Sequence, residues 1–211
     1  MKIIVLFTLI LCASSSLIAQ KKRIAMEPGN FTVFNREATY EDGVAHLDSR
    51  PGDGVLWLAG SEFKNGTIEL DIKGKNTPGR SFVGLAFHGK DNETYDAVYF
   101  RPFNFKHPER NNHSIQYIAM PENDWATLRK AFPGKYENAI NPTPEVPDDW
   151  FHATIEFNYP NVKVYINGSA QPALEVTQLS TGKYGKIGFW VGNGSEGWFK
   201  NLEILKNDGN N

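Results

Sequence analysis

Residues 151–168 read FHATIEFNYPNVKVYING, and this stretch decides the fold. Apolar and polar side chains alternate over residues 151–157 and again over residues 162–166, with the short turn Tyr159-Pro160-Asn161 between the two runs. Successive side chains of a strand point to opposite faces, so each run has one apolar face. The stretch predicts an antiparallel hairpin. Its buried side chains should be Phe151, Ala153, Ile155, Phe157, Val162, Val164 and Ile166.

The rest of the chain repeats this pattern in short segments bounded by Gly, Asn, Asp and Pro. Residues 67–72 alternate in the same way, and two final strands near 187–191 and 199–204 flank a glycine-rich turn at 192–197. A sheet with one apolar face needs a second layer packed against that face. We therefore predict an all-β fold in which two antiparallel sheets form a sandwich.

One helix is expected, from Asn123 to Phe132, inside a long loop insertion at residues 120–149 that is rich in Pro, Asn and Glu. Asn123 is the predicted N-cap, and Trp125, Leu128 and Phe132 recur at helical spacing. We expect the insertion to form an ordered loop over one mouth of the sandwich.

The first nineteen residues have the pattern of a secretory signal peptide, with Lys2, an apolar run at 3–11 and small residues up to Ala19. The run is too short to span a bilayer, and Leu11 before Cys12 disfavours a lipoprotein. We therefore expect an exported protein, periplasmic or secreted, with one domain over residues 20–206 and a disordered tail at 207–211.

The composition of the mature chain narrows the class of partner. Once Lys2 is removed with the signal peptide, 21 basic and 24 acidic side chains remain, and the single cysteine is lost as well. A slight negative charge disfavours nucleic acid as a partner, and the absence of a thiol excludes a cysteine nucleophile. Aromatic residues make up 13% of the chain. An exported domain rich in rings and close to neutral favours carbohydrate as the partner.

Residues 81–105, SFVGLAFHGKDNETYDAVYFRPFNF, contain the clearest candidate binding surface. A strand at 95–103 would place Tyr99 and Arg101 on one face and Asp96 on the other, and a slip of one residue in register exchanges these sets. Rings pack against the C–H faces of sugars, while guanidinium and amide groups bind their hydroxyls. The candidate ligand-binding residues are His88, Tyr99, Arg101, Asn104, Gln116, Tyr117 and Trp125.

Three segments resemble the concanavalin A-like lectin/glucanase superfamily. They are NGTIELDI at 65–72, the hairpin from DWFH at 149–152 to VYING at 164–168, and GKIGFW at 185–190. Within that superfamily they are similar to the laminin-G-like and DUF1080 (3-keto-disaccharide hydrolase-like) domains of exported bacterial proteins. The resemblance covers about residues 31–205. It implies a jelly roll of two curved sheets whose concave face holds carbohydrate.

The superfamily includes glucanases that carry three acidic residues at alternate positions of one strand. The matching positions here are Glu69, Asp71 and Lys73, so the third acid is missing. A retaining glycosidase needs two carboxyl groups at a short, fixed separation. We therefore interpret Glu69 and Asp71 as the solvated face of a strand.

Other side chains are candidates for acid/base chemistry if the protein is an enzyme. Asp96 lies between Tyr95 and Tyr99, where desolvation by rings would raise its pKa, although it could equally bind its own backbone. Glu137 lies in the long insertion, and His113 begins a strand expected beside Arg101. The candidate catalytic residues are therefore Asp96, Glu137 and His113.

No histidines have zinc-ligand spacing, so no metal site is predicted, and calcium is the one candidate cofactor. Its oxygen ligands would come from Asp91-Asn92-Glu93 or from Asp48 with Asp53. The first functional hypothesis is an exported carbohydrate-binding or accessory protein in polysaccharide utilisation. The alternatives are a glycoside hydrolase or lyase of the 3-keto-disaccharide hydrolase-like type, which the resemblance implies, and a structural sandwich that binds other proteins.

Overall fold

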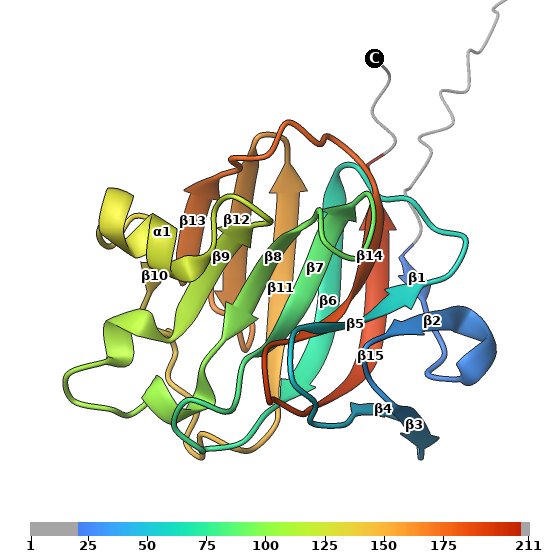
Figure 1. The fold of residues 1–211 in the computed structure, drawn as a ribbon, viewed down its shortest axis with the longest axis horizontal. Helices are drawn as coiled ribbons and strands as arrows, with labels where there is room; N and C mark the ends of the chain where they lie inside the picture. Colours follow the sequence, from blue (N-terminus) through green and yellow to red (C-terminus); the bar gives the residue numbers. More distant parts are fainter. Residues whose placement is uncertain (1–20, 208–211) are drawn as a thin grey trace, which may run out of the picture.

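The computed structural model describes residues 21–207, in which two antiparallel β-sheets pack face to face (Figure 1). We call the sheet nearest the viewer in Figure 1 the front sheet; its strand order is β10-β9-β8-β7-β14-β5-β2. The back sheet has the order β13-β12-β11-β6-β15-β4-β3, and β1 pairs with β15. The predicted all-β sandwich of two antiparallel sheets is confirmed. The expected signal peptide and residues 208–211 of the expected tail lie outside the described residues.

The strands of the two sheets have the following bounds. The front sheet contains β2 (Phe31–Phe34), β5 (Gly54–Leu58), β7 (Val83–Gly89), β8 (Asp96–Phe100), β9 (Ile115–Ala119), β10 (Glu137–Asn138) and β14 (Lys186–Val191). The back sheet contains β1 (Lys22–Arg23), β3 (Ala38–Glu41), β4 (Val44–Leu47), β6 (Gly66–Lys73), β11 (Phe151–Asn158), β12 (Asn161–Ile166), β13 (Leu174–Thr177) and β15 (Gly197–Lys206). Short 3₁₀ helices lie at Pro28–Asn30, Pro102–Asn104 and Asn111–His113.

The hairpin predicted from residues 151–168 is present as β11 and β12, with Ala153 opposite Ile166 and Phe157 opposite Val162. All seven apolar side chains expected to be buried in it are buried. In β6, Ile68, Leu70 and Ile72 are likewise buried. Alternation therefore gave the correct inward face for the centre of the back sheet.

Aromatic rings from the two sheets meet in the core and show which face of the front sheet points inward. Phe100 of β8 lies 4.9 Å from Phe151 of β11, centroid to centroid, and Phe189 of β14 lies 4.6 Å from Phe199 of β15. Because side chains alternate along β8, Asp96, Val98 and Phe100 face the back sheet, and Ala97 and Tyr99 face away from it. The register that the sequence left open is thus the one with Tyr99 outward.

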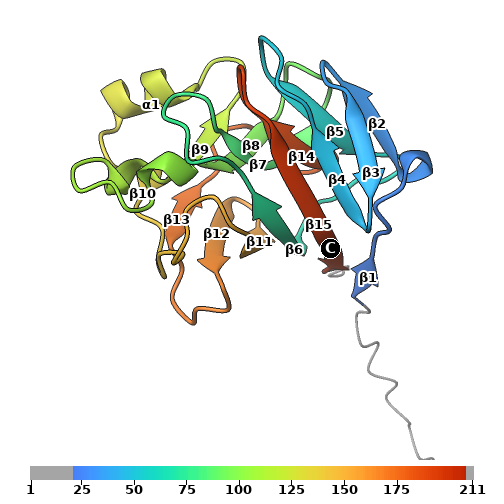
Figure 2. The ribbon, with the colours of Figure 1, turned by 90° about the horizontal axis from the view of Figure 1, so that it is seen from below.

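The single α-helix among the described residues, α1 (Trp125–Ala131), lies beyond the outer face of the front sheet (Figure 2). The sequence predicted this helix but assigned the wrong N-cap. The N-cap is Asp124, whose carboxylate accepts a hydrogen bond from the backbone N–H of Thr127 at 2.7 Å. Asn123 instead forms a bridge to Ala119 at the end of β9, so its backbone groups are already used. None of the described helices has the length and apolar character needed to cross a membrane.

Candidate functional site

The outer face of the front sheet carries two large rings above a glycine. Tyr99 of β8 and Trp190 of β14 pair with Gly84 of β7 from its two sides, and their rings lie 4.9 Å apart. A Cβ atom at Gly84 would lie 2.1 Å from the carbonyl oxygen of Val98 and 2.6 Å from the Cα of Tyr99. Glycine is therefore required where these rings cross the sheet.

A pocket of about 200 Å³ opens over these rings, and we call it the groove pocket. Its aromatic lining consists of Phe82, Tyr99, Trp125 and Trp190, and its carboxyl groups come from Asp53 and Asp124. Trp125, the first residue of α1, leaves 47% of its surface exposed. The groove pocket thus combines apolar ring faces with a few oxygen acceptors, which is the usual composition of a small-molecule site.

Asp53 is fixed at one side of the groove pocket by a chain of hydrogen bonds. The hydroxyl of Tyr95 donates to Oδ2 of Asp53 at 3.2 Å and accepts from Nε1 of Trp190 at 3.0 Å. Burial raises the pKa of Asp53, an effect that the Tyr95 hydrogen bond and the charge of Arg36 oppose. Burial also raises the pKa of Tyr95, so its hydroxyl keeps its proton and continues to donate.

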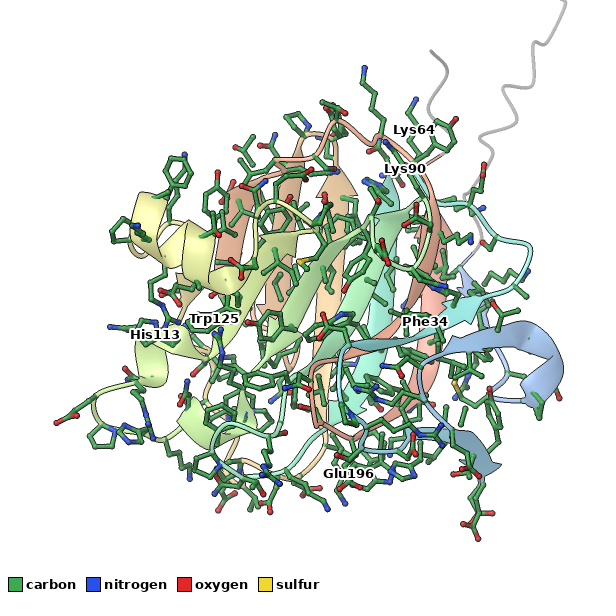
Figure 3. The ribbon with its side chains drawn as sticks, in the orientation of Figure 1. Phe34, Lys64, Lys90, His113, Trp125 and Glu196 are labelled. Atoms are coloured by element: carbon green, nitrogen blue, oxygen red, sulfur yellow. The ribbon has the colours of Figure 1, made fainter. Side chains whose placement is uncertain are left out.

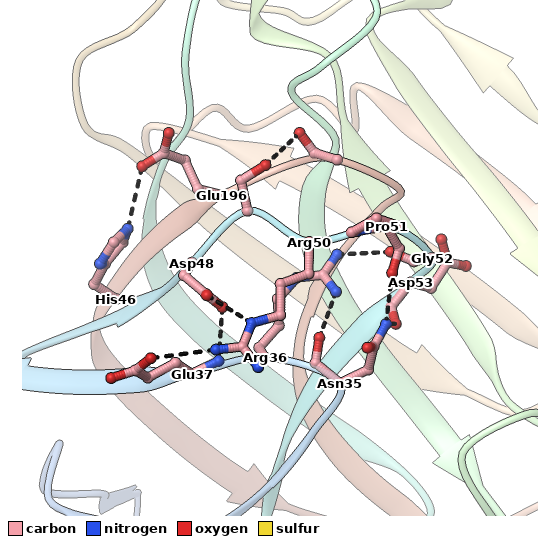
Figure 4. A network of polar contacts seen from close by, with 12 residues as sticks. Asn35, Arg36, Glu37, His46, Asp48, Arg50, Pro51, Gly52, Asp53 and Glu196 are labelled. Carbon is pink, nitrogen blue, oxygen red and sulfur yellow. Dashed lines mark hydrogen bonds and ion pairs between the residues drawn. The ribbon is translucent and has the colours of Figure 1, made fainter.

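The loop that carries Asp53 is held by a network of polar contacts around the buried Arg36 (Figure 4). Nη2 of Arg36 donates to the carbonyl oxygens of Gly52 at 2.7 Å and Gly192 at 2.9 Å. Nδ2 of Asn35 donates to the carbonyl oxygen of Asp53 at 2.8 Å. Arg36 is only 4% exposed, and it bonds to the loop of Gly52 and to the loop of Gly192, which both lie beside the groove pocket. These two loops are therefore held in fixed positions.

Arg101 connects the groove pocket to the far edge of the front sheet. Its Nη2 donates to the Tyr99 hydroxyl at 2.6 Å and to Oε1 of Gln116 at 3.4 Å, while its Nη1 donates to the carbonyl oxygen of His113 at 2.9 Å. The guanidinium also lies 6.0 Å from the centre of the Trp125 ring. A 95% buried cation therefore orients the phenol at the pocket floor.

Glu137 and His113 form a close carboxylate–imidazole pair at that edge. Oε2 of Glu137 lies 2.8 Å from Nδ1 of His113, and Arg129 of α1 binds Glu137 through both Nε and Nη2, the latter at 2.6 Å. Burial pushes the pKa of Glu137 upward, but the hydrogen bonds and charges of Arg129 and His113 outweigh it, so the pKa is lowered. Arg129 in turn lies 5.0 Å from the centre of the Trp125 ring, so the pair lies beside the groove pocket. Figure 3 shows His113 next to Trp125.

The model of the 3-keto-alpha-glucoside-1,2-lyase-like domain matches residues 22–205. The chain belongs to this family. The match spans both sheets and every residue of the groove pocket. The family named from the sequence, and the superfamily around it, are therefore confirmed. No curated protein sequence matches the chain.

Solved structures share the fold of this family member at low sequence identity. The carbohydrate binding module CBM66 from Bacillus subtilis has a TM-score of 0.60 at 17% identity, with 83% of this chain and 95% of that chain covered. The exoplasmic/lumenal domain of VIP36, in a form bound to Ca²⁺ and Man3GlcNAc, has a TM-score of 0.60 at 12% identity, with 86% of each chain covered. A native glycosidic hydrolase has a TM-score of 0.61 at 12% identity, with coverage of 92% and 99%. At these identities the likeness concerns the jelly-roll fold.

The residues singled out from the sequence separate into two groups in this family member. One group lies at the groove pocket and its edge, and comprises Tyr99, Arg101, His113, Gln116, Trp125 and Glu137. The other lies on the inner side of the front sheet, and comprises His88, Asp96 and Tyr117. Asn104 is buried, and its Nδ2 donates a hydrogen bond to the carbonyl oxygen of His113 at 3.1 Å.

The acidic positions compared with glucanases lie on the back sheet, far from the groove pocket. Asp71 accepts from Asn201 at 2.6 Å and lies 2.8 Å from Nδ1 of His152, and Glu69 pairs with Lys21 at 2.7 Å. They form a surface ion-pair network, in keeping with the interpretation as a solvated face.

The candidate calcium ligands are engaged by groups of the protein. Oδ1 of Asp91 accepts from the backbone N–H groups of Glu93 and Thr94, and Asp48 accepts from Arg50 and from the backbone of Glu37. Among the described residues no cluster of three or more His, Cys, Asp or Glu side chains is arranged to hold a metal ion.

Three residues that line the groove pocket, Asp53, Phe82 and Trp190, were not among the binding residues predicted from the sequence. Tyr95, whose hydroxyl bonds to Asp53 and Trp190, was not predicted either. Trp190 alternates with the buried Phe189, so the pattern of β14 already puts it on the outer face. Asp53 lies in a turn, and its link to Tyr95 spans 42 positions of the chain. No local pattern signals that contact.

Proposed function

We propose that this protein binds a neutral carbohydrate in the groove pocket, as an exported binding or accessory protein in polysaccharide use. The observation that carries the proposal is Trp125, an exposed ring beside the ordered rings of Tyr99 and Trp190, with carboxyl oxygens of Asp53 and Asp124 at the sides. Ring faces take up the C–H surface of a sugar, and carboxyl oxygens accept its hydroxyls. The comparison with the carbohydrate binding module supports this proposal.

The size of the groove pocket limits what it can enclose. Pockets that bury a drug-sized molecule measure about 300–1,000 Å³, whereas this one measures about 200 Å³. We therefore expect it to hold one sugar ring, with the rest of an oligosaccharide lying outside.

The test uses an array of neutral oligosaccharides and two matched variants. Trp125→Ala removes the ring at the pocket, and Phe132→Ala removes a similarly exposed ring, 43% against 47%, from the other end of α1. We expect Trp125→Ala to weaken binding about tenfold, a loss typical of a stacking contact. Phe132→Ala should bind as the wild type does. Binding that neither variant changes would place the sugar elsewhere.

A second function, cleavage of a 3-keto-glucoside by elimination, is favoured by the Glu137–His113 pair. Such a reaction removes the C2 proton, which the neighbouring ketone acidifies. The electron pair then forms the C1–C2 double bond as the C1–O bond breaks, and the leaving oxygen takes up a proton. An imidazole whose Nδ1 lies 2.8 Å from an anionic carboxylate is a suitable base for the first step. His113 is one-third exposed beside the groove pocket, so a substrate can approach it.

Release of nitrophenol from 4-nitrophenyl 3-keto-α-glucoside tests this second function. His113→Asn should lower kcat about 100-fold, the usual contribution of a general base. His46→Asn, a matched change on the back sheet, should have no effect. If the wild-type protein binds the substrate and releases no nitrophenol, the elimination is excluded and the binding function stands.

A further inference from the structure

A second pocket, of about 400 Å³, lies at the end of the sandwich where residues 178–185 pass from β13 of the back sheet to β14 of the front sheet. We call it the mouth pocket. Its wall is apolar along Met120, Pro121 and Leu179, and its polar groups include Asp96 and Ser180. Met120 lines both pockets, so the two pockets are neighbours, and their other lining residues differ.

Asp96 is an unusual residue for the inside of a sandwich. It is 1% exposed, and its Oδ2 accepts from the hydroxyls of Tyr117 at 3.1 Å and Ser180 at 2.9 Å. Both donors are uncharged, and its Oδ1 has no hydrogen-bond partner among the described residues. A buried carboxyl without a cation is costly, and burial raises the pKa of Asp96 to about 7.

The neighbouring polar groups do not supply the missing partner. Nε2 of His88 binds the carbonyl oxygen of Lys64 at 2.9 Å, and its Nδ1 accepts from Nε2 of Gln178 at 3.1 Å. Burial lowers the pKa of His88, which keeps the ring neutral. Oε1 of Gln178 is a second buried acceptor with no partner in the described chain. Two acceptor atoms at the floor of the mouth pocket, Oδ1 of Asp96 and Oε1 of Gln178, therefore have no hydrogen-bond partner among the described residues.

A purely structural role does not explain this arrangement. Asparagine has the shape of aspartate, would accept the same two hydroxyl hydrogen bonds, and avoids the cost of burying an ionisable group. The rim of the mouth pocket carries one cation, Lys90, and one anion, Glu122, which together leave it without net charge. A neutral ligand rich in hydroxyl groups fits the two unpartnered acceptor atoms, the apolar wall and the rim without net charge.

We propose that the mouth pocket is a second ligand site, which takes a single neutral sugar ring. The hydroxyls of the sugar bind at Asp96 and Ser180, and its C–H face packs against Met120, Pro121 and Leu179. The volume of about 400 Å³ is within the range of small-molecule sites. This inference does not depend on the groove pocket, because the two sites share only Met120.

The test is a titration of the ¹⁵N-labelled protein with methyl α-D-glucopyranoside, followed by amide chemical shifts. We expect saturable shifts at residues 94–96, 119–123 and 179–182, with a dissociation constant in the millimolar range. Ser180→Ala removes a half-buried hydroxyl of the mouth pocket, and should weaken this binding about tenfold. Asp96→Asn should weaken it by a similar factor while the spectrum remains that of the folded protein.

Trp125→Ala serves as the control that separates the two sites. It should leave the mouth-pocket shifts and their dissociation constant unchanged, even where it removes sugar binding in the groove pocket. The inference is overturned if these residues show no saturable shift. It is equally overturned if Ser180→Ala and Asp96→Asn both bind the glucoside as tightly as the wild type.

Discussion

Asp96 and Glu137 are two buried carboxyl groups of one sheet, with β9 between their strands, and their surroundings drive their pKa values in opposite directions. Glu137 faces outward beside Arg129 and His113, and its pKa is lowered. Asp96 faces inward among hydroxyl groups, and its pKa is raised to about 7. Burial acts on both, so the charge of the partners decides which carboxyl keeps its proton. Glu137 is therefore an anion at neutral pH, whereas Asp96 exchanges a proton near neutral pH.

The largest expected effect is the pH dependence that Asp96 gives to stability. Its folded-state pKa lies above the ordinary value of 3.8, so the folded protein binds the extra proton, and stability falls as pH rises from about 4 to about 7. Asp96→Asn lacks this loss. Relative to the wild type, the variant should gain stability on the order of 4 kcal/mol between pH 4 and pH 9. Urea unfolding across that range measures it, and a constant difference would contradict the assignment.

Glu137→Gln should show the opposite dependence, with a smaller magnitude. The anion stabilises the fold above its unfolded pKa, and this stabilisation is lost as pH falls through its lowered folded pKa. The free energy of unfolding of the variant should be about 2 kcal/mol lower at neutral pH. This loss is smaller than that from breaking a fully buried ion pair, because Arg129 and His113 are each about one-third exposed. The loss should shrink below about pH 4. Glu175→Gln, which breaks an exposed pair with Lys163, is the control and should leave stability unchanged.

Ser180→Ala tests how far its hydroxyl affects the pKa of Asp96. The Ser180 hydroxyl donates to Oδ2 and holds the pKa of Asp96 down, so its removal should move that pKa further above the ordinary range. The ¹³C shift of the Asp96 carboxyl, followed through a pH titration, reports this directly. An unchanged or lower pKa would show that the hydroxyl is not a significant partner.

The smallest effects are expected on the back sheet. Glu69→Gln and Asp71→Asn each remove a carboxylate that is partly solvated in its ion-pair network. Each change should cost about 0.5 kcal/mol or less and leave sugar binding intact. A loss of binding in either variant would move the functional face to the back sheet.

The sequence was sufficient for the parts of the fold that depend on local alternation. The β11–β12 hairpin and the inward face of β6 follow from the order of apolar residues alone. The alternation of β8 gave two possible faces, and choosing between Tyr99 and Asp96 required the contact of Phe100 with Phe151 on the other sheet. Tyr117 joins the inner side because β9 pairs it with Val98. The N-cap shifted by one residue because Asn123 is already bonded to Ala119.

The candidate site depends far more on contacts between distant segments. Asp53, Tyr95 and Trp190 meet across three different regions of the chain, and no spacing in the sequence brings them together. Glu137 was a candidate from the sequence, but its partners on α1 and before β9 follow only from the folded insertion. Residue types therefore indicated the chemistry, and the fold determined which of them share a pocket.

The most direct test of the central claim is a crystal structure of the protein with a neutral oligosaccharide selected by the binding array. The account predicts one sugar ring in the groove pocket, packed against Trp125 and Tyr99, with hydroxyls at Asp53 or Asp124. A sugar bound on the back sheet, with the groove pocket unoccupied, would contradict it.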